Sequence, residues 1–128
     1  MLSVKYPLLL LLPLLLVNGC QRPTNRAPVV ETPQQIEQLS ALISGAMYLR
    51  QECQRKDIPD ESILMQTAVK LAMERNWDTK APAYQALKGK SQARYQALVE
   101  EIGTDNNQCP SLNLLLADFA YEARRNMK

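Results

Sequence analysis

The sequence predicts an all-α protein, a small four-helix bundle with one disulfide, preceded by a signal peptide and a flexible tether. Apolar residues recur at steps of three and four in the segments after residue 32, as they do on the buried face of amphipathic helices. Proline and glycine residues punctuate these segments, and no run alternates apolar with polar residues as a half-buried strand does. An apolar leader and a polar stretch come first, so we divide the chain into residues 1–19, 20–31 and 32–128.

Residues 1–19 have the anatomy of a lipoprotein signal peptide. A short start that carries Lys5 is followed by an apolar run from Pro7 to Val17. As a helix this run spans about 16 Å, well short of the roughly 30 Å hydrocarbon core, so cleavage is favoured over a permanent membrane span. Gly19 directly before Cys20, with branched apolar residues upstream, resembles the lipobox of bacterial lipoproteins. An ordinary secretory peptide with a cysteine nearby is the alternative.

Cys20 is therefore the predicted lipidation site, and its covalent lipid is the only attached group that we expect. Since each buried methylene adds about 0.8 kcal/mol, several acyl chains would hold the chain firmly in a membrane. Gln21 follows Cys20, where aspartate is associated with inner-membrane retention, so lipoprotein sorting rules imply an outer-membrane location facing the periplasm. Residues 21–31 have little to bury and predict a flexible tether. A loop packed on the domain is the alternative.

The folded domain is predicted to begin with a helix from Thr32 to about Cys53. Thr32-Pro33-Gln34-Gln35 is a typical helix start, with a hydroxyl cap, a proline at the first position and an amide that answers the cap. A second helix is predicted from around Pro59-Asp60-Glu61, where a proline and two acids suit an N-terminus, to near Asn76-Trp77. Trp77 is expected to fill the core, with an interface anchor as the alternative.

The second half of the domain predicts a short helical turn and two further helices. The turn covers residues 84–88 and is expected to stop near Gly89. A third helix is predicted from about Ser91 to Ile102, directly before Gly103. The last helix is predicted from Cys109 to Met127, because apolar residues recur there with helical spacing. They are Leu112, Leu115, Leu116, Phe119, Ala123 and Met127.

Cysteine usage fits an exported, lipidated protein. Lipidation of Cys20 leaves Cys53 and Cys109, which can pair in an oxidising compartment. A disulfide between the end of the first helix and the start of the last would close a loop of 57 residues, from 53 through 109. In the chain-entropy model such a loop stabilises by about 4 kcal/mol. Two free buried thiols are the alternative.

Composition argues against several functions. A net charge of +2, from 15 basic and 13 acidic residues, is too balanced for a nucleic-acid footprint. The chain has no histidine, so it lacks the usual general base and the commonest zinc ligand. The acidic residues fit helix ends and solvated faces. We therefore predict no catalytic residue, no metal site, no small-molecule substrate and no nucleic-acid partner.

Taken in order along the chain, the residues resemble those of the pilotins of type II secretion systems (PulS/OutS-like), lipoproteins that escort an outer-membrane secretin. The resemblance covers nearly the whole mature chain and is carried by the lipobox cysteine, Leu49-Arg50-Gln51-Glu52-Cys53, Ile58-Pro59, Ala68, Ala72, Asn76-Trp77-Asp78, Tyr84, Leu87, Tyr95-Gln96-Ala97-Leu98, Cys109 and Leu112. It implies a four-helix fold, a disulfide between the first and last helices, and binding of the C-terminal segment of a secretin subunit as a helix in a groove. A structural or inhibitory outer-membrane lipoprotein that binds another envelope protein is the alternative.

The helical wheel suggests where such a groove would lie. The first helix is apolar over about 160°, which is wider than one bundle seam requires. If Cys53 and Ala46 mark the centre of the core, one flank of the helix is left for another surface, and a helical peptide could lie there. The predicted groove residues are Ile36, Leu39, Ile43, Met47, Tyr95 and Leu98. The alternative is that all of them belong to the core.

Overall fold

The structure is a computed structural model that describes residues 29–103 and 106–127. All regular secondary structure in these ranges is helical, which confirms the predicted fold class. The elements are α1 (Thr32–Glu52), α2 (Glu61–Glu74), the 3-10 helix η2 (Pro82–Ala86), α3 (Leu87–Ile102), the 3-10 helix η3 (Asn106–Gln108), α4 (Cys109–Leu115) and α5 (Ala117–Arg125). The predicted signal peptide, Cys20 and the tether up to residue 28 lie outside the described residues.

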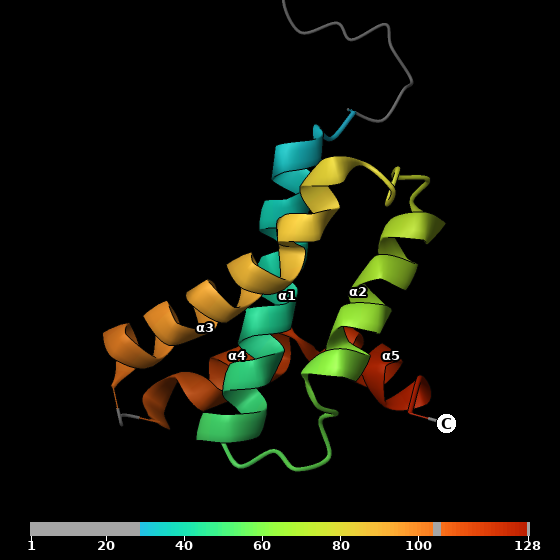
Figure 1. Cartoon of the computed structure of the whole chain (residues 1–128). Helices are drawn as coiled ribbons and strands as arrows, with labels where there is room; N and C mark the ends of the chain where they lie inside the picture. The colour runs from blue at the N-terminus through green and yellow to red at the C-terminus, as the bar shows by residue number, and fades with distance from the viewer. Residues whose placement is uncertain (1–28, 104–105, 128) are drawn as a thin grey trace, which may run out of the picture.

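Helix α1 is the centre of the domain. Figure 1 shows it running down the middle of the molecule, with α3 on the left, α2 on the right, and α4 and α5 near its lower half. All four of these helices and η2 contact it. Because neighbours approach α1 from several directions, it contributes more buried residues than any other element described here.

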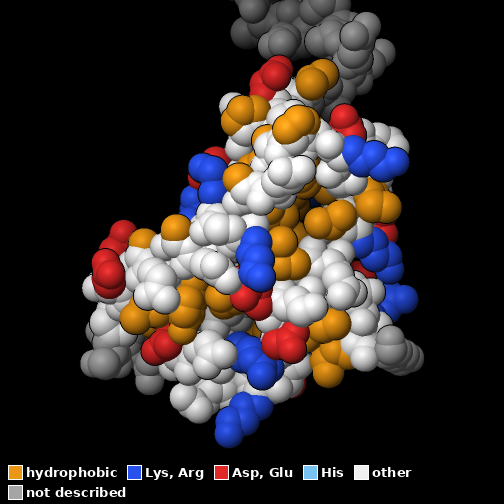
Figure 2. Space-filling view, in the orientation of Figure 1, with side chains coloured by type: hydrophobic (Ala, Val, Ile, Leu, Met, Phe, Trp, Pro, Cys, Tyr) orange, Lys and Arg blue, Asp and Glu red, His pale blue; other side chains and the backbone are white. Residues whose placement is uncertain are grey.

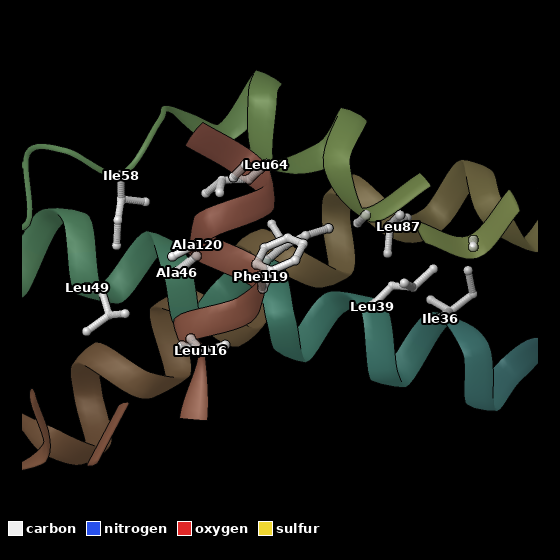
Figure 3. Close-up of a cluster of buried hydrophobic side chains, with 14 residues drawn as sticks. Ile36, Leu39, Ala46, Leu49, Ile58, Leu64, Leu87, Leu116, Phe119 and Ala120 are labelled. Carbon is white, nitrogen blue, oxygen red and sulfur yellow. The ribbon is translucent and has the colours of Figure 1, made fainter. Parts of the chain in front are cut away.

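The core joins side chains from every long segment of the described chain (Figure 3). Leu39 and Ala46 of α1 meet Leu64 of α2, Leu87 of α3 and Phe119 of α5, and all five are at most 4% exposed. Burying a side chain the size of leucine or phenylalanine contributes about 1.5–3 kcal/mol. The core therefore ties the last helix of the chain to the first.

The start of α1 differs from the predicted capping box. The helix begins at Thr32 with Glu31 as its N-cap, and no side chain caps it. Gln35 instead donates its amide to the Val30 carbonyl at 2.8 Å, and its amide oxygen accepts a hydrogen bond from the Tyr84 hydroxyl at 2.6 Å. A tertiary contact with η2 has therefore taken the place of a local cap. The start of α2 is as predicted, because the Asp60 carboxylate accepts a hydrogen bond from the Ile63 N–H at 3.3 Å.

The predicted stop at Gly89 is wrong. Helix α3 already begins at Leu87, directly after η2, and Gly89 lies within its first turns. The Leu87 side chain is fully buried, so the core holds this turn helical. The end of the helix is as predicted, since Gly103 adopts a φ of +68°, which a glycine accommodates without strain.

The predicted last helix is divided in two. The break is at Leu116, whose φ of −105° and ψ of 11° separate α4 from α5. Leu116 is almost fully buried and packs on Gly45 of α1. Helix α4 buries none of its residues, whereas α5 buries Phe119, Ala120 and Ala123. The two halves therefore have different roles, and α5 completes the core.

Matched glycine substitutions test this packing. A Cβ at Gly89 would meet no atom within 4 Å, so we expect Gly89→Ala to raise the free energy of unfolding by about 0.5–1 kcal/mol through helix propensity. A Cβ at Gly45 would lie 2.7 Å from Cδ1 of Leu116, so this side chain must move and Gly45→Ala should gain nothing. Equilibrium denaturation measures both changes. Equal stabilisation by the two alanines would contradict the close packing of Leu116 on α1.

Candidate functional site

A largely apolar groove lies between α1, α3 and α4. Its volume is about 580 Å³. The residues that line it are Ala41, Leu42, Ser44 and Gly45 of α1, Arg94, Ala97, Leu98 and Glu101 of α3, and Leu112, Leu115 and Leu116 at and after α4. We call these eleven residues the groove. Figure 2 shows hydrophobic side chains gathered at the lower left, in the region between α3 and α4.

A second hollow continues the groove toward the connection between α3 and α4. Its volume is about 450 Å³, and it shares Leu98, Glu101 and Leu112 with the groove. Ile102 and Gln108 complete its lining. Because they share residues of α3 and α4, the two hollows adjoin each other and together offer a larger surface than either alone.

The groove walls expose apolar surface that the domain itself does not cover. Leu115 is 77% exposed on α4, although its spacing from Leu112 places both on one helical face. On the α1 side the groove is lined by the small residues Ala41, Ser44 and Gly45, of which Ser44 and Gly45 are buried and Leu116 packs on Gly45. Contiguous exposed apolar surface of this kind is typical of a protein-binding site.

The structure places most of the predicted groove residues elsewhere. Ile36 is 2% exposed, and Leu39 and Ile43 are fully buried, so the prediction that they line a groove is wrong. Their flank of α1 is covered because α1 is surrounded by other helices. Met47 is partly buried against the core and does not line the groove. Leu98 is the one residue of the predicted set that lines it.

Tyr95, a predicted groove residue, does not line the groove and instead forms a hydrogen bond within the domain. Its hydroxyl donates a hydrogen bond to the Glu52 carboxylate at 2.9 Å and so ties α3 to the end of α1. Burial, together with this hydrogen bond, raises the pKa of Tyr95 to about 12. The hydroxyl therefore stays protonated and remains a donor at any physiological pH.

Sequence reasoning missed the α1 and α4 sides of the groove. Leu112, Leu115 and Leu116 follow the same helical periodicity as Phe119, so periodicity does not distinguish these groove residues from the core. The cluster of small residues around Gly45 was a usable signal, since small residues on an apolar helix leave room for a close neighbour. The sequence alone could not distinguish room for a partner from room for this chain's own helix.

The disulfide is present and fixes one end of the groove. Cys53, which ends α1, is bonded to Cys109, the first residue of α4, with their Cα atoms 5.9 Å apart. The bond confirms the predicted pairing of the two cysteines, and the alternative of two free buried thiols is wrong. Helix α4 has no fully buried residue and contacts the core through the partly buried Leu112, so the covalent bond adds to a limited core contact.

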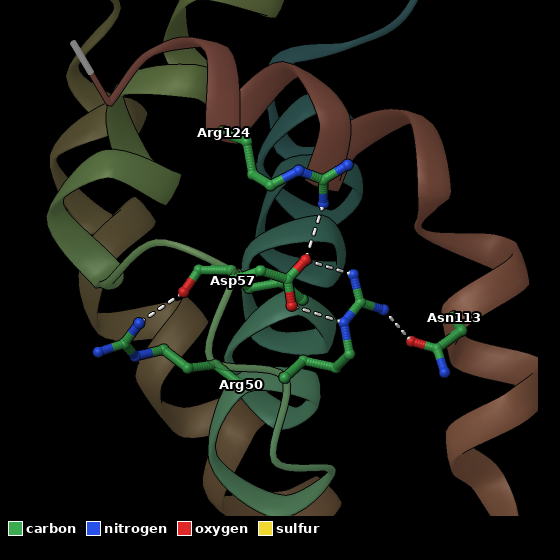
Figure 4. A network of polar contacts seen from close by, with 6 residues as sticks. Arg50, Asp57, Asn113 and Arg124 are labelled. Atoms are coloured by element: carbon green, nitrogen blue, oxygen red, sulfur yellow. Dashed lines mark hydrogen bonds and ion pairs between the residues drawn. The ribbon is translucent and has the colours of Figure 1, made fainter.

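A charged cluster adds a second attachment for α4 (Figure 4). Arg55 donates two hydrogen bonds of 2.8 Å to the Asp57 carboxylate and another to the side-chain oxygen of Asn113 on α4. Arg124 of α5 reaches the same carboxylate at 3.2 Å. Arg50 donates to the Ile58 carbonyl at 2.5 Å. The loop after α1 is thereby joined to α4 and α5.

Acid titration of Asp57 tests this cluster. Hydrogen bonding by Arg55 lowers the pKa of Asp57 from 3.8 to about 2, so the carboxylate stabilises the fold above pH 4 and this stabilisation is lost as the pH falls through 2. Because the side chain is about half exposed, the contribution is expected to be under about 1 kcal/mol. Denaturation of Asp57→Asn should show a deficit at pH 7 that disappears near pH 2. A deficit that persists at pH 2 would mean that charge is not its cause.

Other features of the described residues are structural. Trp77 is partly buried against the core, as predicted, and the guanidinium of Arg75 lies 5.1 Å from the centre of its ring.

Among residues 29–103 and 106–127, no group of three or more cysteine or acidic side chains could hold a metal ion. None of the helices described in these ranges is both long enough and apolar enough to cross a bilayer.

Several known proteins are similar to this chain. The model of the family described as type II secretion system pilotin lipoprotein (PulS_OutS) matches residues 17–120. Pilotin OutS from Dickeya dadantii (strain 3937) is 34% identical over 117 residues, which cover 86% of each chain. Pullulanase secretion protein PulS from Klebsiella pneumoniae is 32% identical over 113 residues, which cover 87% of this chain and 89% of that protein.

Two solved structures share the fold. A pilotin in a pilotin/secretin peptide complex superposes with a TM-score of 0.70 and is 36% identical, covering 74% of this chain and 98% of its own. A chain of the Klebsiella pneumoniae type II secretion system outer membrane complex, which contains PulD, PulS and the PulC HR domain, superposes with a TM-score of 0.66. It is 29% identical and covers 73% of this chain and 99% of its own.

Proposed function

The chain belongs to the family of type II secretion pilotin lipoproteins, and on this premise we propose that it binds the C-terminal segment of a secretin subunit and directs that secretin to the outer membrane for assembly. The observation that carries the proposal is the groove, with its exposed Leu115 and its floor of small residues. It is largely apolar, as a helix-in-groove interface requires. The similar fold of a pilotin solved with a secretin peptide supports the same partner.

The physical basis of binding is transfer of apolar side chains from water into the groove. A secretin tail that is disordered when free loses conformational entropy as it becomes helical, so part of the burial energy is offset and moderate affinity is expected. No chemical step is needed. The proposed role is therefore that of a binding protein without catalytic activity.

The proposed anchor gives the bound secretin its destination. We place a lipid on Cys20, in the outer membrane, with the domain in the periplasm. Residues 21–28 would span up to about 26–29 Å when extended, which is enough to hold the groove clear of the lipid headgroups. Any secretin subunit held in the groove would then travel with the lipoprotein.

Binding is tested with a matched pair of leucines on α4. Leu114 and Leu115 are 82% and 77% exposed, but only Leu115 lines the groove. Full-length protein in detergent micelles is titrated with a fluorescent peptide of the C-terminal segment of the secretin produced in the same cell. Leu115→Asp should abolish binding and Leu114→Asp should retain it. Failure of the unsubstituted protein to bind any such secretin segment would refute the proposal.

Targeting is tested with Cys20→Ser in cells. The substitution removes the proposed lipid site and leaves Cys53 and Cys109 to pair. Fractionation should then find the secretin away from the outer membrane, although the peptide still binds the substituted protein. Normal outer-membrane assembly of the secretin with Cys20→Ser would show that the anchor does not direct it.

A further inference from the structure

The charges of α3 run against the dipole of that helix. Its first turn carries Lys88 and Lys90 and no acid, and its last turn carries Glu100 and Glu101 and no base. A helix is favoured by the reverse order, with acids at the positive N-terminus and bases at the negative C-terminus. Helix α5 has this favourable order. The charge order of α3 therefore does not serve the stability of α3 itself.

Two of the α3 charges lie in the groove. Arg94 and Glu101 both line it, with Ala97 and Leu98 between them. The two charges are seven positions apart on the helix, which is about two turns or 10–11 Å along the axis. The groove therefore has a basic end and an acidic end on the same wall.

The basic end keeps a net positive charge, and the acidic end keeps its negative charges unpaired by the described residues around it. At the basic end Arg94 forms the closer ion pair with Glu37, at 2.6 Å, and Lys90 reaches the same carboxylate at 3.5 Å, so these three side chains together carry one net positive charge. At the acidic end no ion pair joins Glu100 or Glu101 to another residue in the described ranges. Figure 2 shows acidic side chains at the far left, where α3 ends, and basic side chains nearer its start.

We propose that Arg94 and Glu101 set the direction of the bound secretin segment, which lies antiparallel to α3 with its N-terminus at Glu101 and its C-terminus at Arg94. The proposal rests on the proposed function. The positive end of the segment's helix dipole then meets Glu101 and the negative end meets Arg94, and the dipole of α3 acts in the same sense. The opposite direction would bring like charges together at both ends. A segment with a basic residue about two turns before an acidic one complements the groove best.

Photo-crosslinking measures the direction. Full-length protein in detergent micelles is mixed with secretin C-terminal peptides that carry a photo-reactive residue near either the N- or the C-terminus, and the crosslinked sites are mapped by mass spectrometry. The N-terminal probe should react near Glu101 and the C-terminal probe near Arg94. The reverse assignment, or reaction of both probes at both ends, would overturn the proposal.

Neutral substitutions measure the contribution of each charge. Arg94→Gln and Glu101→Gln should each weaken peptide binding about 2- to 5-fold at low salt, with little loss at high salt. Lys90→Gln and Glu100→Gln are the controls, because they remove the neighbouring charges that do not line the groove, and their effect should be smaller. Unchanged affinity in both groove variants would overturn the assignment. Absence of binding by the unsubstituted protein, or crosslinks outside the groove, would refute the proposed function itself, which is a separate result.

Discussion

Replacing both bonded cysteines, as Cys53→Ser with Cys109→Ser, is expected to lower the free energy of unfolding by about 4 kcal/mol. The bond closes a loop between residues 56 positions apart, so its loss frees a large part of the unfolded chain. Its loss also frees the start of α4, which buries none of its residues. We therefore expect weaker peptide binding as well, because Leu112 and Leu115 lose their fixed position. Equilibrium denaturation and peptide titration measure the two effects.

Two controls separate the bond from the substitutions. The unsubstituted protein treated with a reductant should unfold like the double serine variant, because both lack the same covalent link. Cys20→Ser should unfold like the unsubstituted protein, since Cys20 is not part of the bond. Equal stability of the oxidised and reduced proteins would show that the contacts of Arg55 with Asp57 and Asn113 hold the loop and α4 without the disulfide.

Neighbouring residues of α1 provide the second test, because Ile43 belongs to the core and Leu42 lines the groove. Ile43 is fully buried, so Ile43→Ala is expected to cost about 2–5 kcal/mol through lost burial and the cavity that remains. Leu42 is only partly buried, so Leu42→Ala should cost less. Peptide affinity should change in the opposite order, with the larger loss for Leu42→Ala. Denaturation gives the stabilities, and titration under conditions where both variants are folded gives the affinities.

The outcome also decides between the two descriptions of α1. If Ile43→Ala were mild and abolished peptide binding, the flank predicted from the helical wheel would be the binding surface after all. If Leu42→Ala left binding unchanged, the peptide would not contact the α1 side of the groove. Leu39→Ala serves as an independent core control, since Leu39 is fully buried and lies outside the groove.

The sequence by itself determined the features that depend on local chemistry. The spacing of apolar residues predicted α1 and α2, because amphipathic periodicity is a property of neighbouring turns. Asp60 marked the start of α2 and Gly103 the end of α3 because an N-cap and a positive φ are decided within a few residues. The pairing of Cys53 with Cys109 followed from the number of cysteines and their places at helix ends.

Tertiary structure decided what depends on segments far apart in the chain. Gly89 does not end a helix because the buried Leu87 holds that turn, and the last helix breaks at Leu116 because this residue packs on Gly45. The location of the groove is decided in the same way. An apolar residue of α1 is core or surface according to which helix covers it, as the buried Ile43 and the groove residue Leu42 show. Periodicity reports that a face is apolar, whereas packing between distant segments determines whether the protein covers that face or leaves it for a partner.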